Sequence, residues 1–215
     1  MKFKIPNTKY CFPNFGLVFC LLSIMYCLLL FSCKNKKENL TLDYQYDYAP
    51  IDSGHFVIYD VDSIVYSYNG VQTNDTAHYQ MMEQVGDTFY DNLNQLNYEL
   101  NLYRRSDSTS SWVYDRKWSV KRTLQNYQKK EGDLNFVKLV FPPQEGKDWN
   151  GNVYIPTIDI YSIFLNWDYL YVNVGTPFSV NGLNFDSTLT VNEIVDSNAI
   201  EKTLRKEVYA KGVGM

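Results

Sequence analysis

Alternation of polar and apolar side chains with a period of two residues dominates the sequence beyond residue 40. Residues 43–48 alternate strictly between polar residues and tyrosine, and residues 56–68 are rich in β-branched and aromatic side chains. A strand places successive side chains on opposite faces of a sheet, so this period predicts strands with one buried face. We therefore expect a strand in each of the two segments.

Further strand candidates follow at the spacing of an antiparallel meander. They are residues 77–85, 95–103, 111–118, 119–127, 133–141, 161–174, 188–195 and 207–210. Residues 199–210 also suit a helix by composition, and we expect the strand. Turn-forming residues separate the segments, at Asn69-Gly70, Asp91-Asn92, 131–133, 150–152 and Asn181-Gly182. This number of strands predicts an all-β fold, a curved antiparallel sheet in the form of a half-barrel or a sandwich.

The first 32 residues differ in character from the rest. Residues 1–9 include three lysines, a nearly unbroken apolar run covers residues 15–31, and no acidic residue occurs before Glu38. A cationic head followed by an apolar run and a small residue at its end is typical of a secretory signal peptide. The alternative is an uncleaved membrane helix. The polar residues 34–37 directly after the run favour cleavage.

Residues 30–33, Leu-Phe-Ser-Cys, resemble the lipobox of bacterial lipoproteins. The resemblance implies cleavage between Ser32 and Cys33 and acylation of Cys33, with palmitate among the expected chains. Each buried methylene contributes about 0.8 kcal/mol to membrane binding, so two or three chains anchor a domain far more durably than one. By analogy with lipoprotein sorting, Lys34 in place of an aspartate favours the outer membrane, with the domain facing the periplasm.

The expected organisation is therefore a signal peptide over residues 1–32, a lipidated tether over residues 33–40 and a single β-rich domain over residues 41–215. All four cysteines lie at or before Cys33, which excludes disulfides and thiolate metal sites from the domain. Removal of the leader leaves seventeen basic and twenty-four acidic residues, a formal charge of −7. An acidic domain does not suit nucleic acid, whose binding depends on basic side chains.

Three stretches resemble a pattern of uncharacterised bacterial envelope lipoproteins. Residues 48–59 are similar to its opening Y-x-P-L-x-x-G-x-x-W-x-Y, with Phe56 near the usual tryptophan. Residues 139–149 are similar to its F-P-x-x-x-G-x-x-W turn, and residues 209–215 to its closing strand Y-x-x-G-V-G-x-V. The resemblance implies a LolA/LolB-like half-barrel, an antiparallel sheet curved round an apolar cavity. It implies no catalytic residue.

Candidate catalytic and metal-binding residues are few. The two histidines, His55 and His78, lie in no arrangement that would place two imidazoles on one metal. Residues 52–55, Asp-Ser-Gly-His, contain the residue types of a catalytic triad, but a triad requires side chains that converge from separate elements. We therefore expect no cofactor, no metal and no catalytic residue.

Carboxylates at close spacing give one further candidate. Asp60 and Asp62 would share one face of a strand, where paired acids could serve glycoside hydrolysis or bind calcium. The simpler interpretation is a solvated face opposite the core. Glu99 is a further candidate by residue type alone. Residues 181–186 have oxygen ligands, but they lack the spacing of an EF-hand and suit a turn.

Three functions remain compatible with these features. The first is a non-enzymatic, membrane-anchored envelope lipoprotein that binds a hydrophobic ligand. The second is a structural lipoprotein that docks another envelope protein. The third, a carbohydrate-active enzyme, requires two carboxylates in one cleft. Seventeen tyrosines follow residue 32, and they could form an exposed binding platform or fill a half-buried sheet. We expect the latter.

Substitution Cys33→Ala tests the anchor. Without the thiol, no diacylglycerol attaches, so the precursor should stay uncleaved or the domain should leave the membrane fraction. Cys27→Ala, inside the apolar run, is the matched control and should mature normally. Fractionation and intact-mass measurement provide the readout. A Cys33→Ala protein that still matured on the membrane would exclude the lipobox.

Overall fold

The computed structural model describes residues 26, 42–68, 72–165, 167–197 and 202–215. The chain divides into two units, residues 1–42 and 43–215. The predicted signal peptide and tether, residues 1–40 with Ser32 and Cys33, lie outside the described residues apart from Tyr26. Within the described part of the chain, no helix has the length and apolar character needed to cross a membrane.

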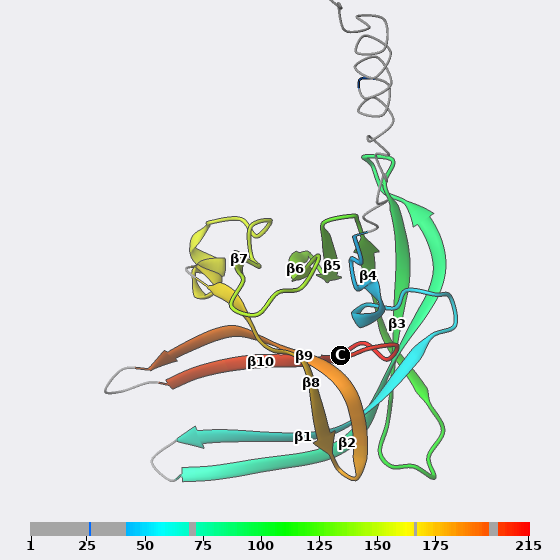
Figure 1. The fold of residues 1–215 in the computed structure, drawn as a ribbon. Helices are drawn as coiled ribbons and strands as arrows, with labels where there is room; N and C mark the ends of the chain where they lie inside the picture. The colour runs from blue at the N-terminus through cyan, green and yellow to red at the C-terminus, as the bar shows by residue number, and fades with distance from the viewer. Residues whose placement is uncertain (1–25, 27–41, 69–71, 166, 198–201) are drawn as a thin grey trace, which may run out of the picture. The chain divides into compact units, whose positions relative to one another are not determined.

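Six consecutive strands form the first sheet of residues 43–215 (Figure 1). They are β1 (Phe56–Tyr68), β2 (Gln72–Tyr90), β3 (Leu96–Arg105), β4 (Val113–Arg122), β5 (Asn126–Glu131) and β6 (Leu134–Val140). Each strand pairs antiparallel with the next, and the sheet curls into a half-barrel. This arrangement confirms the predicted all-β fold with a curved antiparallel sheet.

Four strands form the second sheet, in the order β10-β9-β8-β7. They are β7 (Asp148–Asn150), β8 (Asp168–Val180), β9 (Leu183–Ser197) and β10 (Lys202–Ala210). Two short 3₁₀ helices, η1 (Tyr46–Tyr48) and η2 (Asp159–Phe164), complete the described elements. The predicted Asn181-Gly182 turn joins β8 to β9. Its two residues have φ angles of 48° and 79°, the positive values that a tight hairpin requires.

Several strand predictions are confirmed. The strand over residues 56–68 has the predicted bounds, and β10 confirms a strand rather than a helix near residue 207. Residues 43–48, however, are not a strand. Gln45 adopts a left-handed conformation with φ 55°, and η1 follows. The tyrosines of this segment do not alternate between two faces of a sheet. The rings of Tyr44 and Tyr46 stack on each other with their centroids 5.2 Å apart, and Tyr48 is fully buried in the core.

Other boundaries differ from the prediction as well, for example at β2, which extends over Gln72–Tyr90 where residues 77–85 were expected. A single strand, β4, continues across residues 118–119, and the chain turns at Thr123, whose Oγ1 accepts hydrogen bonds from the backbone N–H groups of residues 125 and 126. Residues 161–164 belong to η2, because Phe164 packs edge-on against aromatic rings of the core. The predicted closing strand ends at Ala210, since Gly212 and Gly214 have φ angles of 73° and 96° and the chain folds back.

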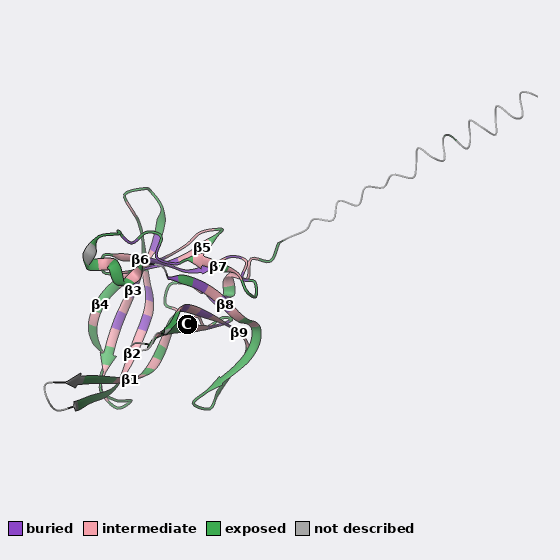
Figure 2. Cartoon of the chain, turned by 90° about the vertical axis from the view of Figure 1, so that its left-hand side faces the viewer, coloured by how far each residue is buried: buried purple, intermediate pink, exposed green. Residues whose placement is uncertain are grey.

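Tyrosines dominate the core that lies between the two sheets. Tyr48, Tyr169 and Tyr171 are fully buried, together with leucine and valine side chains of β6 and β9 (Figure 2). Their hydroxyl groups are all bonded, for example Tyr169 to Asn152 Oδ1 at 3.1 Å and Tyr171 to the Val140 carbonyl at 2.9 Å. A buried phenol is stable only when its hydroxyl finds a partner. These tyrosines are core residues rather than an exposed platform.

Candidate functional site

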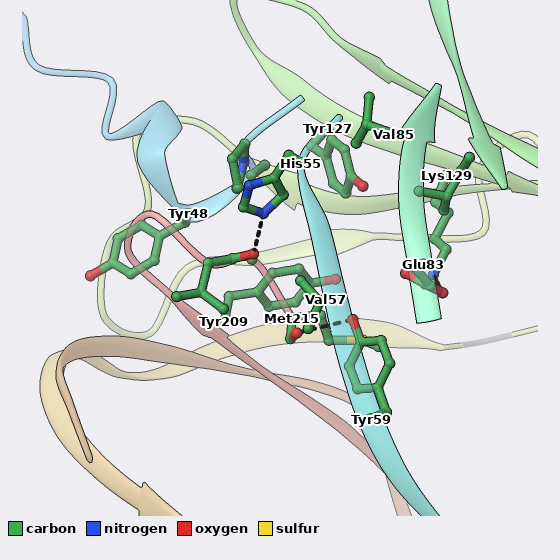
Figure 3. A pocket seen from close by; sticks show the side chains of 15 residues that line it. Tyr48, His55, Val57, Tyr59, Glu83, Val85, Tyr127, Lys129, Tyr209 and Met215 are labelled. Carbon is green, nitrogen blue, oxygen red and sulfur yellow. Dashed lines mark hydrogen bonds and ion pairs between the residues drawn. The ribbon is translucent and has the colours of Figure 1, made fainter. Parts of the chain in front are cut away.

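The concave side of the first sheet encloses a small cavity (Figure 3). Its volume is about 40 Å³, and Tyr59, Tyr127 and Tyr209 line it together with the ion pair Glu83–Lys129. A water molecule needs roughly 10–15 Å³ by the same measure, whereas small-molecule sites have volumes of about 300–1,000 Å³. The cavity therefore has room for a few water molecules and not for an acyl chain.

The C-terminal residues close one side of this cavity. His55 Nε2 lies 2.8 Å from the carbonyl oxygen of Val213, and the Tyr59 hydroxyl donates to the main-chain oxygen of Met215 at 3.0 Å (Figure 3). A carbonyl oxygen only accepts, so His55 donates through Nε2. The imidazole is thus engaged with the backbone of residue 213. This contact gives His55 a structural role and not that of a triad base with Asp52 and Ser53.

A buried ion cluster joins the two sheets. Lys138 Nζ on β6 donates to Glu193 Oε1 on β9 at 2.6 Å and to Glu207 Oε1 on β10 at 2.7 Å. The side chains of Lys138 and Glu193 are each 1% exposed. Tyr209 donates to Glu207 Oε2 at 2.6 Å, so the second oxygen of Glu207 is also satisfied. Fixed opposite charges replace the hydration that each ion loses on burial.

Glu193 continues the inward alternation of β9, since Leu189 and Val191 before it are also buried. It is in addition the extra residue of a β-bulge: Arg205 of β10 pairs with Ile194 and Lys206 with Asn192, so no residue of β10 lies opposite Glu193. Glu193 Oε2 lies 3.1 Å from Arg205 Nε but at an angle that makes no hydrogen bond, and it is buried.

The cluster shifts the pKa values of its members in different directions. Burial and the charge of Glu207 raise the pKa of Glu193, in spite of Lys138. Burial would raise the pKa of Glu207 as well, but the charge of Lys138, the hydrogen bonds from Lys138 and Tyr209 and the charge of Lys129 together outweigh it and lower that pKa. Burial would lower the pKa of Lys138. The negative charges of Glu207, Glu193 and Glu131 outweigh this effect and raise the pKa of the amine. Lys138 and Glu207 are therefore a stable ion pair.

The carboxylates singled out in the sequence do not meet. Asp60 accepts a hydrogen bond from Gln80 at 2.7 Å, and Asp62 lies 2.8 Å from the ring of His78. Both acids are exposed on β1, as expected of a solvated face, and the hydrogen bond to Asp62 raises the pKa of His78. Glu99, on β3, pairs with Lys117 at 2.6 Å. Among the described residues, no three potential ligands lie close enough to hold a metal ion.

The cluster was missed at the sequence level, although a signal for it exists. Lys138 interrupts the apolar strand over residues 134–140, and Glu193 follows Leu189 and Val191 at the inward positions of β9. A charge at an inward position of a strand predicts a buried partner. The sequence does not say which residue that partner is.

Large apolar side chains are exposed in the connection between β7 and β8, in the segment that includes η2 (yellow in Figure 1). Within residues 158–165, which we call the aliphatic loop, four large side chains are between 42% and 74% exposed: Ile158, Ile160, Ile163 and Leu165. From residue 148 to residue 201 the sequence has seven acidic residues and no basic one. Asp148, Asp168, Asp186 and Asp196 of this stretch are exposed.

Comparison with protein-family models, with curated protein sequences and with solved structures finds no match to this chain.

Removal of the Lys138 charge tests the role of the cluster. Lys138→Met keeps most of the side-chain volume but removes the cation that two buried carboxylates share, so we expect a loss of about 3–5 kcal/mol of unfolding free energy. Lys117→Met is the control, because Lys117 is 49% exposed and pairs with Glu99 at the surface. That change should cost less than about 1 kcal/mol. Urea unfolding at neutral pH compares the two, and equal losses would contradict the assigned role.

Alkaline pH should destabilise the protein. Burial, first of all, raises the pKa of six tyrosines above the ordinary 10.0. The shift is large for five of them: Tyr59, Tyr127, Tyr169, Tyr171 and Tyr209. Above pH 10 the unfolded chain releases phenolic protons that the folded protein keeps, so stability falls as pH rises, by up to about 1.4 kcal/mol per pH unit for each group. The raised pKa of Lys138 acts in the same direction above 10.5.

Tyr171→Phe should flatten this alkaline loss, because it removes one of the five groups. Tyr66→Phe, at a side chain that is 65% exposed, is the control. The free energy of unfolding in urea, measured at a series of pH values from about pH 8 to well above pH 10, provides the readout. Constant stability above pH 10 in the unsubstituted protein would contradict the prediction.

Proposed function

We propose that this chain is an outer-membrane lipoprotein, anchored through Cys33, whose β-domain docks a partner protein in the periplasm and catalyses no reaction. The anchor rests on the apolar run and the lipobox-like residues 30–33. The observation that supports docking is the aliphatic loop, whose four large side chains are exposed while the interior cavity has a volume of about 40 Å³. Exposed apolar side chains at this density are typical of interaction sites.

The stretch of sequence that contains the loop, residues 148–201, has a formal charge of −7, as large as that of the whole chain beyond residue 32. Glu193 of this stretch is buried beside Lys138, and Arg116, Lys117 and Arg205 line one depression together with Phe164 of η2, so charges of both signs lie near the loop. The expected partner therefore presents apolar side chains to the aliphatic loop, with charged residues of both signs around them.

A carrier of hydrophobic ligands is less well supported. The space under the half-barrel is taken up by the Lys138 cluster and the Glu83–Lys129 pair, whose Nζ–Oε1 distances are 2.6–2.7 Å. Enlarging the cavity to several hundred Å³ would separate these ions, which are costly to leave unpaired. Native mass spectrometry of the protein from its own envelope, before and after organic extraction, distinguishes the two functions. An apo mass agrees with docking, and a discrete extractable mass would favour the carrier.

A glycosidase is also poorly supported. Glu193 and Glu207 approach each other at Lys138, but Lys138 donates to both and Glu193 is 1% exposed. A catalytic carboxylate pair needs access to the sugar and one free acid.

Photo-crosslinking in the host envelope tests the docking surface. A photoreactive residue in place of Ile160, which is 74% exposed, should give one discrete adduct, because this side chain would contact the partner. Ile163→Asp should reduce the adduct at least about tenfold, since it inserts a charge into an apolar contact. The control is the same photoreactive residue at Val113, which is 65% exposed on β4. Equal adducts at both positions, or none at Ile160, would refute docking through this loop.

A further inference from the structure

A polar depression lies on the first sheet, on the face of β3, β4 and β5 that points away from the core, and extends to β6. Its volume is about 660 Å³, within the usual range of ligand sites. Six amide side chains line it: Gln95, Asn97, Gln125, Asn126, Gln128 and Asn135. Cross-strand neighbours supply several of the lining groups, because Lys121 pairs with Gln128 and Lys130 pairs with Asn135 in the sheet register.

Two of the six amides are buried, and several are held in place by hydrogen bonds to one another or to neighbouring groups. Asn97 is 8% and Gln128 is 5% exposed. Asn135 Nδ2 donates to Gln128 Oε1 at 3.1 Å, and Gln128 Nε2 donates to Asn126 Oδ1 at 2.9 Å. Asn97 Nδ2 donates to Asp91 Oδ2 at 3.1 Å. Asn97 Nδ2 also donates to the Gln95 carbonyl at 2.8 Å, so both of its donors are used. An amide group can form four hydrogen bonds, so these contacts fix the side chains, while Asn126, Gln128 and Asn135 keep donors or acceptors for a ligand.

The charges and the rim of the depression indicate the class of ligand. Asp91 and Asp133 balance Lys121 and Lys130, so the depression has no net charge that would favour an anion or a cation. Phe89 and Tyr154, at the rim, are 40% and 54% exposed. Neutral sugars match this set, because their hydroxyl groups both donate and accept and their C–H faces pack on aromatic rings.

We propose that this depression is a binding site for neutral oligosaccharides. The site is independent of the proposed docking function, since Gln128 and Tyr154 lie outside the aliphatic loop over residues 158–165. It needs no catalytic group.

Titration of the processed protein with maltotriose, cellotriose and the trimer of N-acetylglucosamine tests the proposal. The protein is kept in a detergent without a sugar headgroup, and binding is followed by calorimetry and saturation-transfer NMR. We expect saturable binding of at least one sugar at millimolar concentration. Gln128→Ala and Tyr154→Ala should each weaken it about tenfold, through a lost hydrogen bond and a lost stacking contact.

Tyr114→Ala is the matched control, because Tyr114 is also 54% exposed but lies outside the depression on β4. It should leave the affinity unchanged. Tyr154→Ala replaces a half-exposed loop residue, so it tests the site even where Gln128→Ala fails to fold. Absence of saturable binding for all three sugars would overturn the proposal. So would binding that Tyr154→Ala leaves unchanged.

Discussion

The contact of Lys138 with Glu193 and Glu207 connects the two sheets at their buried centre. Lys138 belongs to the first sheet and both carboxylates belong to the second, and the Nζ–Oε1 distances are 2.6 and 2.7 Å. A buried ion without its partner is far less stable than a hydrated one, so a shift of either sheet by one residue would be strongly unfavourable. The bulge at Glu193 lies at the same point, since no residue of β10 pairs with the residue whose carboxylate contacts Lys138. We infer that the cluster fixes the packing of the sheets more than it adds to net stability.

The same cluster explains why the cavity on the concave side of the first sheet is small. Ionic side chains and tyrosines surround it, and residues 213–215 close one side, so that its volume is about 40 Å³. A wider depression of about 650 Å³ opens beside it, between Tyr59 of β1 and the strand β10, and Glu193 and Glu207 line that depression. Curvature alone therefore does not imply a ligand chamber. A sheet can curl round polar, tightly bonded groups as well as round a cavity.

The proposed functions consequently use outer surfaces. The aliphatic loop is apolar and lies in an acidic stretch of sequence, whereas the depression on β3–β6 is rich in amides and balanced in charge. The ligands proposed for these two surfaces differ accordingly, a protein for the first and a neutral sugar for the second. A lipid-anchored domain with both would hold a protein partner beside a glycan, with each contact raising the effective concentration for the other.

The sequence by itself determined the features that depend on neighbouring residues. Alternation predicted the strand over residues 56–68, and Asn181-Gly182 predicted the hairpin turn between β8 and β9, because the pleat of a strand and a left-handed φ are local properties. Local alternation was misleading at residues 43–48, where the rings found partners in the core instead of a sheet. Only the tertiary structure decided which charges meet: Lys138 and Glu193 are 55 positions apart, whereas the adjacent Asp60 and Asp62 remain solvated. Which buried charges pair depends on which strands and sheets become neighbours. The alternation within a strand does not determine those neighbours.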